Sequence, residues 1–150
     1  MLKDKIKARG FVELVLRDAD GNIKTVKKEN LITDLGIAFL AARITAEASN
    51  PMTRIGVGTG TTAAAAGDSA LGTEVVRVVF DSAVAATTTT TDDSITTVTT
   101  FGAGVGTGAL TEAGMFADAS AGDMLSRVVF AVVNKGASDT LTITWTIVIA

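Results

Sequence analysis

The sequence predicts an all-β protein with one helix, arranged as an antiparallel two-sheet sandwich of the jelly-roll type. Val, Thr, Ala and Gly dominate the 150-residue chain, and aromatic residues make up only 5% of it. Such a composition favours strands whose backbones pack closely. About eight short strand-like segments alternate with turn residues, a pattern typical of sandwiches and barrels.

Two short sequence motifs, each of which occurs twice and in the same order, strengthen this prediction. Gly56–Gly60 (GVGTG) is followed by Arg77–Phe80 (RVVF), and Gly104–Gly108 (GVGTG) is followed by Arg127–Phe130 (RVVF). A repeated strand unit is typical of a scaffold, because repeats stack to share a core. We therefore expect two related β halves in one domain covering residues 10–150, preceded by a basic extended arm at residues 1–9.

The first element of the domain is a predicted hairpin. Residues 10–17 and 23–28 have strand character, and the residues between them, Asp-Ala-Asp-Gly-Asn, have turn composition. Asp18, Asp20 and Asn22 also match the first positions of a calcium loop, and Glu29 matches its closing carboxylate. The sixth position is Ile23, where that loop requires Gly for a sharp bend, so we do not predict calcium there.

Residues 33–48 are the one predicted helix. Thr33 or Asp34 supplies an N-cap, and Pro51 cannot continue a helix. A predicted apolar face includes Leu35 and Phe39, and it favours packing on an end or edge of a sheet.

The remaining chain is predicted to form strands with small-residue loops between them. The predicted strands cover residues 52–58, 73–82, 94–102, 124–133 and 140–149, and residues 109–117 are predicted as a short strand or an extended loop. The last of these alternates strictly from Leu141 through Trp145, with threonines opposite. This alternation predicts an antiparallel strand with one buried face.

Charge is distributed unevenly along the chain. Residues 1–28 contain eight basic and four acidic residues, whereas the rest contains five basic and twelve acidic residues. In an extended arm, Lys3, Lys5, Lys7 and Arg9 point the same way. One interpretation is an arm that binds an acidic protein surface; the other is a solvated strand face or a frayed terminus. The short basic set without interleaved aromatics does not favour nucleic acid.

The composition excludes most catalytic chemistry. The chain has no His and no Cys, which removes the commonest general base and the thiolate nucleophile. The two GVGTG motifs lack the glycine spacing of a dinucleotide-binding site, and no helix is predicted to follow them. No apolar run approaches the roughly 18 residues of a membrane span. We therefore predict no enzyme activity, no cofactor and no metal.

Two arginines and two glutamates are the candidate ion pairs. Arg77 and Arg127 are the first residues of the two RVVF motifs. Glu74 and Glu112 occupy related places in the two predicted β halves. A planar guanidinium suits a partly buried or interfacial carboxylate. We expect these four residues to form structural or subunit-interface ion pairs, with Arg77 or Arg127 bonded to a carboxylate or to carbonyls at a sheet end.

Several motifs resemble those of small structural proteins of tailed bacteriophages. They are ENLITDLG (29–36), MTRIGVGTGTT (52–62), AGDSALGTE (66–74), LTEAGMF (110–116) and LTITW (141–145). The resemblance implies a virion protein made in the host cytoplasm, either a capsid decoration (cement) protein or a tail-fibre or baseplate module.

The decoration role implies a capsid-surface protein, expected as a homotrimer, that binds the major capsid protein through Lys3, Lys5, Lys7 and Arg9. It also implies that removing residues 1–9 weakens attachment and leaves the fold intact. A tail module that binds a host surface or a fibre shaft is the second hypothesis, and a small enzyme or soluble binding domain is the third.

Overall fold

The computed structural model describes residues 6–45 and 50–150. Lys3 and Lys5 of the predicted arm lie outside these residues. Within them, nine strands and one helix follow in the order β1 (Ala8–Arg17), β2 (Ile23–Ile32), α1 (Asp34–Ala42), β3 (Arg54–Gly58), β4 (Glu74–Val79), β5 (Ser82–Ala86), β6 (Ser94–Phe101), β7 (Gly108–Phe116), β8 (Met124–Lys135) and β9 (Thr140–Ile149).

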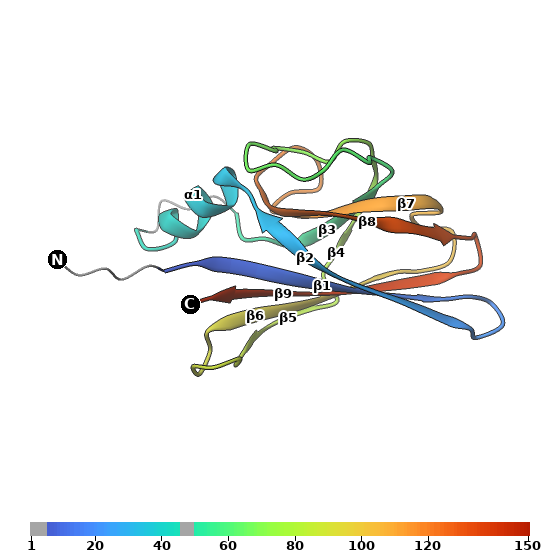
Figure 1. The fold of residues 1–150 in the computed structure, drawn as a ribbon, viewed down its shortest axis with the longest axis horizontal. Coiled ribbons are helices and arrows are strands. Elements are labelled where there is room, and N and C mark those ends of the chain that lie inside the picture. The colour runs from blue at the N-terminus through green and yellow to red at the C-terminus, as the bar shows by residue number, and fades with distance from the viewer. Residues whose placement is uncertain (1–5, 46–49) are drawn as a thin grey trace.

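All nine described strands join edge to edge in one curled antiparallel sheet, in the order β4-β3-β7-β8-β2-β1-β9-β6-β5. The long strand β2 makes the turn between the two ends of the sheet (Figure 1). Its first part, residues 23–30, pairs with β1, and its last residues, Leu31 and Ile32, pair with β8. The predicted antiparallel β domain with one helix is therefore confirmed, whereas a two-sheet jelly roll is not confirmed.

The core lies inside the curl of the sheet. Alternate residues of β1, β3, β7, β8 and β9 point inward and form one apolar cluster. Trp145 is fully buried in it, and its indole Nε1–H donates to Asn30 Oδ1 at 3.1 Å. The prediction of an inward Leu141–Trp145 face is confirmed, since Leu141 and Ile143 are also 0% exposed.

One predicted strand is split in two. The sequence predicts a strand over residues 73–82, but β4 ends at Val79 and β5 begins at Ser82. Between them, the Phe80 amide donates to Thr53 O and the Asp81 amide donates to Val98 O. The chain thus passes directly from one end of the sheet to the other, which strand propensity alone does not reveal.

The helix is shorter than predicted and turns a different face to the core. It ends at Ala42, with Arg43 as its C-cap; the predicted residues 46–48 lie outside the described residues. Thr33 is its N-cap and accepts from the Gly36 amide at 2.9 Å. Phe39 is buried as predicted, but Leu35 is 39% exposed, because Gly36 faces β8 in its place.

The hairpin turn uses the aspartate that resembled a calcium ligand. Asp18 Oδ1 accepts from the amides of Asp20 and Asn22, and Asp18 Oδ2 accepts from Asn22 Nδ2. Glu29 lies well inside β2, opposite Phe11 of β1. The motif therefore builds a turn and a strand in place of one continuous loop.

Candidate functional site

The predicted arginines and glutamates meet on the face of the sheet that points away from the core. Gly56 of β3 pairs with Arg77 of β4 on one side and with Gly114 of β7 on the other. Gly114 in turn pairs with Arg127 of β8. The two arginines therefore share one cross-strand row and are separated by two glycines.

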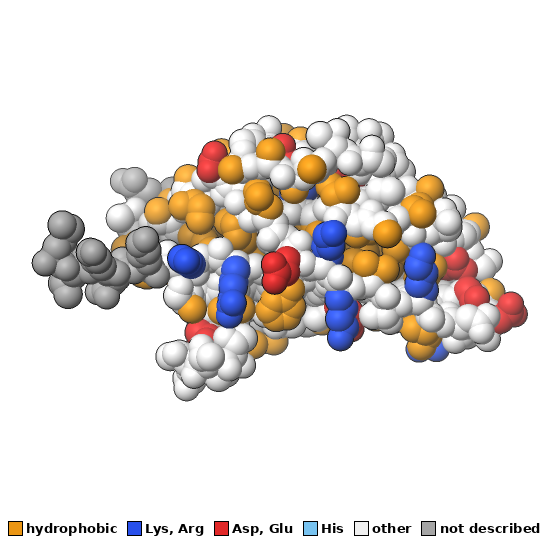
Figure 2. Space-filling view, in the orientation of Figure 1, with side chains coloured by type: hydrophobic (Ala, Val, Ile, Leu, Met, Phe, Trp, Pro, Cys, Tyr) orange, Lys and Arg blue, Asp and Glu red, His pale blue; other side chains and the backbone are white. Residues whose placement is uncertain are grey.

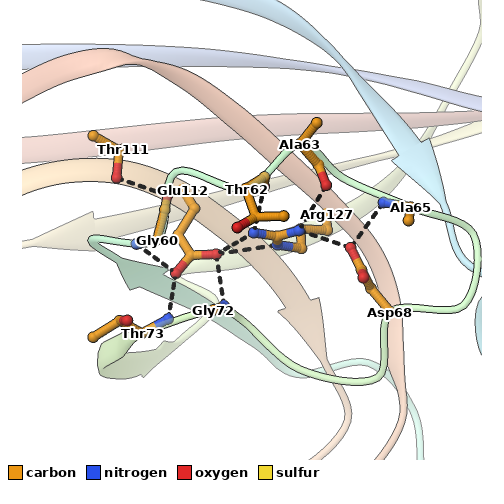
Figure 3. A network of polar contacts seen from close by, with 10 residues as sticks. All are labelled: Gly60, Thr62, Ala63, Ala65, Asp68, Gly72, Thr73, Thr111, Glu112 and Arg127. Atoms are coloured by element: carbon orange, nitrogen blue, oxygen red, sulfur yellow. Dashed lines mark hydrogen bonds and ion pairs between the residues drawn. The ribbon is translucent and has the colours of Figure 1, made fainter.

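The two glutamates form a neighbouring row. Gly58 of β3 pairs with Glu74 on β4 and with Glu112 on β7. Glu112 is 0% exposed and Arg127 is 3% exposed. Their side chains lie under the loop that joins β3 to β4, residues 59–73 (Figure 3).

Glu112 and Arg127 form an ion pair with two hydrogen bonds. Arg127 Nη2 and Nε donate to Glu112 Oε2 at 2.8 and 3.1 Å. Arg127 Nη1 also donates to Asp68 Oδ2 at 2.7 Å. The remaining guanidinium protons go to the carbonyls of Thr62 and Ala63, so every N–H of Arg127 has an acceptor.

The Glu112 carboxylate is equally saturated. Its Oε1 accepts from the amides of Gly60 and Thr73, both at 2.8 Å. Its Oε2 accepts from the Gly72 amide at 2.9 Å in addition to Arg127. These amides come from both ends of the loop (Figure 3). One buried carboxylate thus fixes a loop that has no strand or helix of its own.

The environment keeps these groups ionised. Burial alone would raise the pKa of Glu112, but hydrogen bonds from Thr73, Gly72, Arg127 and Gly60 outweigh it and lower the pKa below its usual 4.5. The Ala65 amide and Arg127 likewise lower the pKa of Asp68. For Arg127, burial opposes the charge, but the two carboxylates raise its pKa.

These shifts predict a loss of stability in acid. A carboxylate whose pKa is lower in the folded protein stabilises it fully above the unfolded value and loses that contribution as pH falls through the folded value. The free energy of unfolding, measured by urea titration, should therefore fall as pH drops below about 4.5, the ordinary pKa of Glu112. In Glu112→Gln the decline should be shallower; an identical pH profile in both proteins would contradict the assignment.

The second pair, Arg77 with Glu74, lies nearer the surface. Arg77 Nε and Nη2 donate to the two oxygens of Glu74 at 2.8 and 2.9 Å. Its Nη1 donates to the carbonyls of Asp118 and Ala121, and its guanidinium lies 3.6 Å from the centre of the Phe116 ring. Arg77 thus holds the β7–β8 turn as Arg127 holds the β3–β4 loop. Both bonding patterns occur within one chain, beneath loops.

The two GVGTG motifs are not structurally equivalent. The first lies on β3 and beyond it, where a Cβ on Gly58 would come within 2.6 Å of Glu112 Oε1. The second forms the turn between β6 and β7, with Gly104 at φ +76° and Gly106 at φ +67°. The glycines of the first motif leave space for the Glu112 side chain, and those of the second adopt backbone angles that non-glycine residues rarely adopt.

The basic residues lie elsewhere, on the first hairpin. Arg9 is exposed on β1, and Lys7 and Ala150 exchange backbone hydrogen bonds at 2.7 and 2.9 Å. The described part of the predicted arm therefore continues the sheet. Lys24, Lys27 and Lys28 are exposed on β2, and with Lys7 and Arg9 they form a basic band along the first hairpin, parts of which are visible in Figure 2. The band also contains Glu13 and Glu29, and Lys27 pairs with Glu13 at 3.2 Å. Lys24 and Lys28 lie opposite Leu16 and Val12 in the register, so they project from the other side of the hairpin than Lys27.

This arrangement suits structure better than reaction chemistry. General acid–base catalysis needs a titratable group within reach of a substrate proton, but Glu112 is enclosed and fully bonded. Asp68 is the one member of the network that the sequence analysis missed. Its spacing from Arg127 carries no motif, and only the folded loop brings the two together.

The chain matches no known protein-family model, no curated protein and no solved structure. In residues 6–45 and 50–150, no helix is long and apolar enough to span a bilayer. The same residues contain no group of three or more acidic side chains placed to hold a metal ion.

Proposed function

We propose that this chain is a structural virion protein of a tailed bacteriophage that decorates the outer capsid shell and stabilises contacts between capsid subunits. The observation that carries the proposal is the exposed basic band (Lys7, Arg9, Lys24, Lys27 and Lys28) on a chain whose remaining sequence is acidic. The band has a net positive charge, because its five basic side chains outnumber Glu13 and Glu29, and such a band steers a protein toward an acidic surface and sets its orientation there. The resemblance of the sequence motifs described above to phage structural proteins supports a shell of major capsid protein as that surface.

The buried ion pairs support a structural role. Arg127, Glu112 and Asp68 fix a surface loop, and every N–H of Arg127 and both oxygens of Glu112 are taken up by hydrogen bonds within the protein. In this proposal the two ends of the curled sheet act as the two layers of a jelly-roll-like sandwich around the shared core. The rigid body then presents the basic band to the shell, where apolar burial completes the contact.

A tail-fibre or baseplate module is the second candidate. The outer face of β9 favours it, because Thr140, Thr142 and Thr144 form a row of hydroxyls that is partly accessible. Such a face suits a fibre shaft or a polar host surface. Binding to isolated tails in place of shells would select this candidate.

Charge reversal on the basic band tests the decoration role. Deleting residues 1–9 is less informative than the sequence suggested, because Ala8 and Arg9 belong to β1. The double substitution Lys7→Glu with Arg9→Glu should lower the affinity for bare shells about tenfold or more, which is about 1.4 kcal/mol or more. Co-sedimentation with purified shells measures this.

The matched control keeps both charges. Lys7→Arg with Arg9→Lys should bind shells like the original chain, and binding of the original chain should weaken as salt rises, because salt screens exposed charges. Equal binding by the reversed and the charge-conserving variants would refute the proposed docking surface.

A further inference from the structure

An apolar groove opens between the helix and the end of the sheet. It encloses about 510 Å³ between α1 and strands β5, β6 and β9. Its apolar walls include Phe39, Leu40, Met52, Phe80, Val84 and Ile95. Val84 is 56% exposed and Ile95 is 47% exposed, so the groove is open to solvent along one side.

One wall of this groove is a free sheet edge. β5 is the terminal strand of the sheet and pairs only with β6 among the described strands. Its five residues, Ser-Ala-Val-Ala-Ala, contain no charge and no proline. Natural edge strands usually carry charged residues or proline, which prevent pairing with another chain. β5 is therefore suited to accept an added strand.

The start of the chain has the complementary pattern. Ile6 is 82% exposed, the second most exposed large apolar side chain in the described residues. In an extended arm Leu2, Asp4 and Ile6 share one face, and Lys3, Lys5 and Lys7 share the other. The apolar face carries one acidic group, and the apolar groove is lined by one cation, Arg43, whose guanidinium lies 4.7 Å from the centre of the Phe39 ring.

Distance prevents the arm from pairing with β5 of its own chain. β1 and β5 are separated by β9 and β6, so three strand spacings, about 14 Å in all, lie between them. Ile6 directly precedes Lys7, which exchanges backbone hydrogen bonds with Ala150 of its own chain, so residue 6 cannot also lie at the β5 edge of that chain.

The geometry points to a strand exchange between copies, in which residues 2–6 of one chain add to the β5 edge of a second chain. Leu2 and Ile6 enter the groove, and Asp4 pairs with Arg43. The aspartates on either side of β5, Asp81 and Asp92–Asp93, favour the arm's lysines. The contact is heterologous, so it closes into a ring when the rotation between copies allows it, in keeping with the expected trimer.

Cysteine trapping tests the exchange, because the natural chain has no cysteine. One preparation carries Ile6→Cys, a second carries Ala85→Cys, and the two are mixed under mild oxidation; Ala85 lines the groove and pairs with Ile95, so it shares the face that Ile6 enters. The exchange predicts a disulfide-linked pair that contains one chain of each kind. The matched control replaces Ala85→Cys with Val132→Cys, which is 42% exposed on β8 and lies away from the groove; it should give no such pair.

A charge swap provides the second test and does not depend on disulfide geometry. Asp4→Arg alone and Arg43→Glu alone should each shift the solution mass toward the 15.3 kDa monomer, and the double variant should restore the oligomer. Equal trapping at Ala85→Cys and Val132→Cys, or a monomeric original chain, would overturn the exchange. Neither experiment uses shells. Trapping by a chain that fails to bind shells would overturn only the decoration role, and shell binding without trapping would overturn only the exchange.

Discussion

Glu112→Gln is expected to lower the free energy of unfolding by about 3–5 kcal/mol, the usual cost of removing one partner of a buried ion pair. The substitution keeps the shape of the side chain but removes its charge. Arg127, 3% exposed, then keeps only Asp68 as an anionic partner. The new amide group also places two donors among three backbone N–H groups that need acceptors. Urea unfolding at neutral pH measures the loss.

Glu74→Gln is the matched control. Its side chain is 31% exposed, and solvent screens such an ion pair, so the expected loss is below about 1 kcal/mol. Arg77 also keeps the carbonyls of Asp118 and Ala121. A loss of less than about 1 kcal/mol for Glu112→Gln itself would show that the network adds little to stability.

Trp145→Ala is expected to cost a similar amount, about 3–5 kcal/mol, because it leaves a large cavity in the core. Trp145 is 0% exposed and is the largest fully buried side chain of the described residues. Its loss also removes the indole donor to Asn30 Oδ1. Thermal unfolding monitored by far-UV circular dichroism should show a markedly lower midpoint.

The neighbouring position serves as its control. Thr144 lies on the opposite face of β9 and is half-buried, so Thr144→Ala should change stability by less than about 1 kcal/mol. Equal losses at positions 144 and 145 would contradict the assignment of the two faces of β9.

The strands were most predictable where alternation is strict. Leu141, Ile143 and Trp145 alternate with threonines, and only a strand with one buried face explains that period. The start of the helix was predictable for a similar local reason, since Thr33 is a good N-cap. These features depend on residues close together in sequence.

The two GVGTG copies do not occupy equivalent places in the fold, because identical pentapeptides can adopt different conformations. In the first copy, residues 56–58 are held extended by pairing with β4 and β7, whereas Gly104–Gly108 bends between β6 and β7. The equivalent of Gly56 in the second half is Gly114, which pairs with Arg127 as Gly56 pairs with Arg77. Tertiary pairing, which the sequence alone does not display, decides between these conformations.

The site was half predictable for the same reason. Arg127 and Glu112 belong to adjacent strands of one hairpin, so a cross-strand pair was a reasonable expectation. Asp68 and the amides of Gly60, Gly72 and Thr73 come from the β3–β4 loop, where the motifs GVGTG and AGDSALGTE show no helix or strand period and do not indicate a pairing. Their convergence on one carboxylate depends on how that loop folds over the sheet.

Hydrogen–deuterium exchange of the full chain tests the central claim most directly. If buried charge fixes residues 59–73 as part of a rigid scaffold, the amides of Gly60, Gly72 and Thr73 should exchange as slowly as those of the β7–β8 ladder. They should also exchange far more slowly than the loop amides of Ala63 and Gly67, which are exposed residues. Exchange of the three amides at the rate of those loop residues would contradict the account.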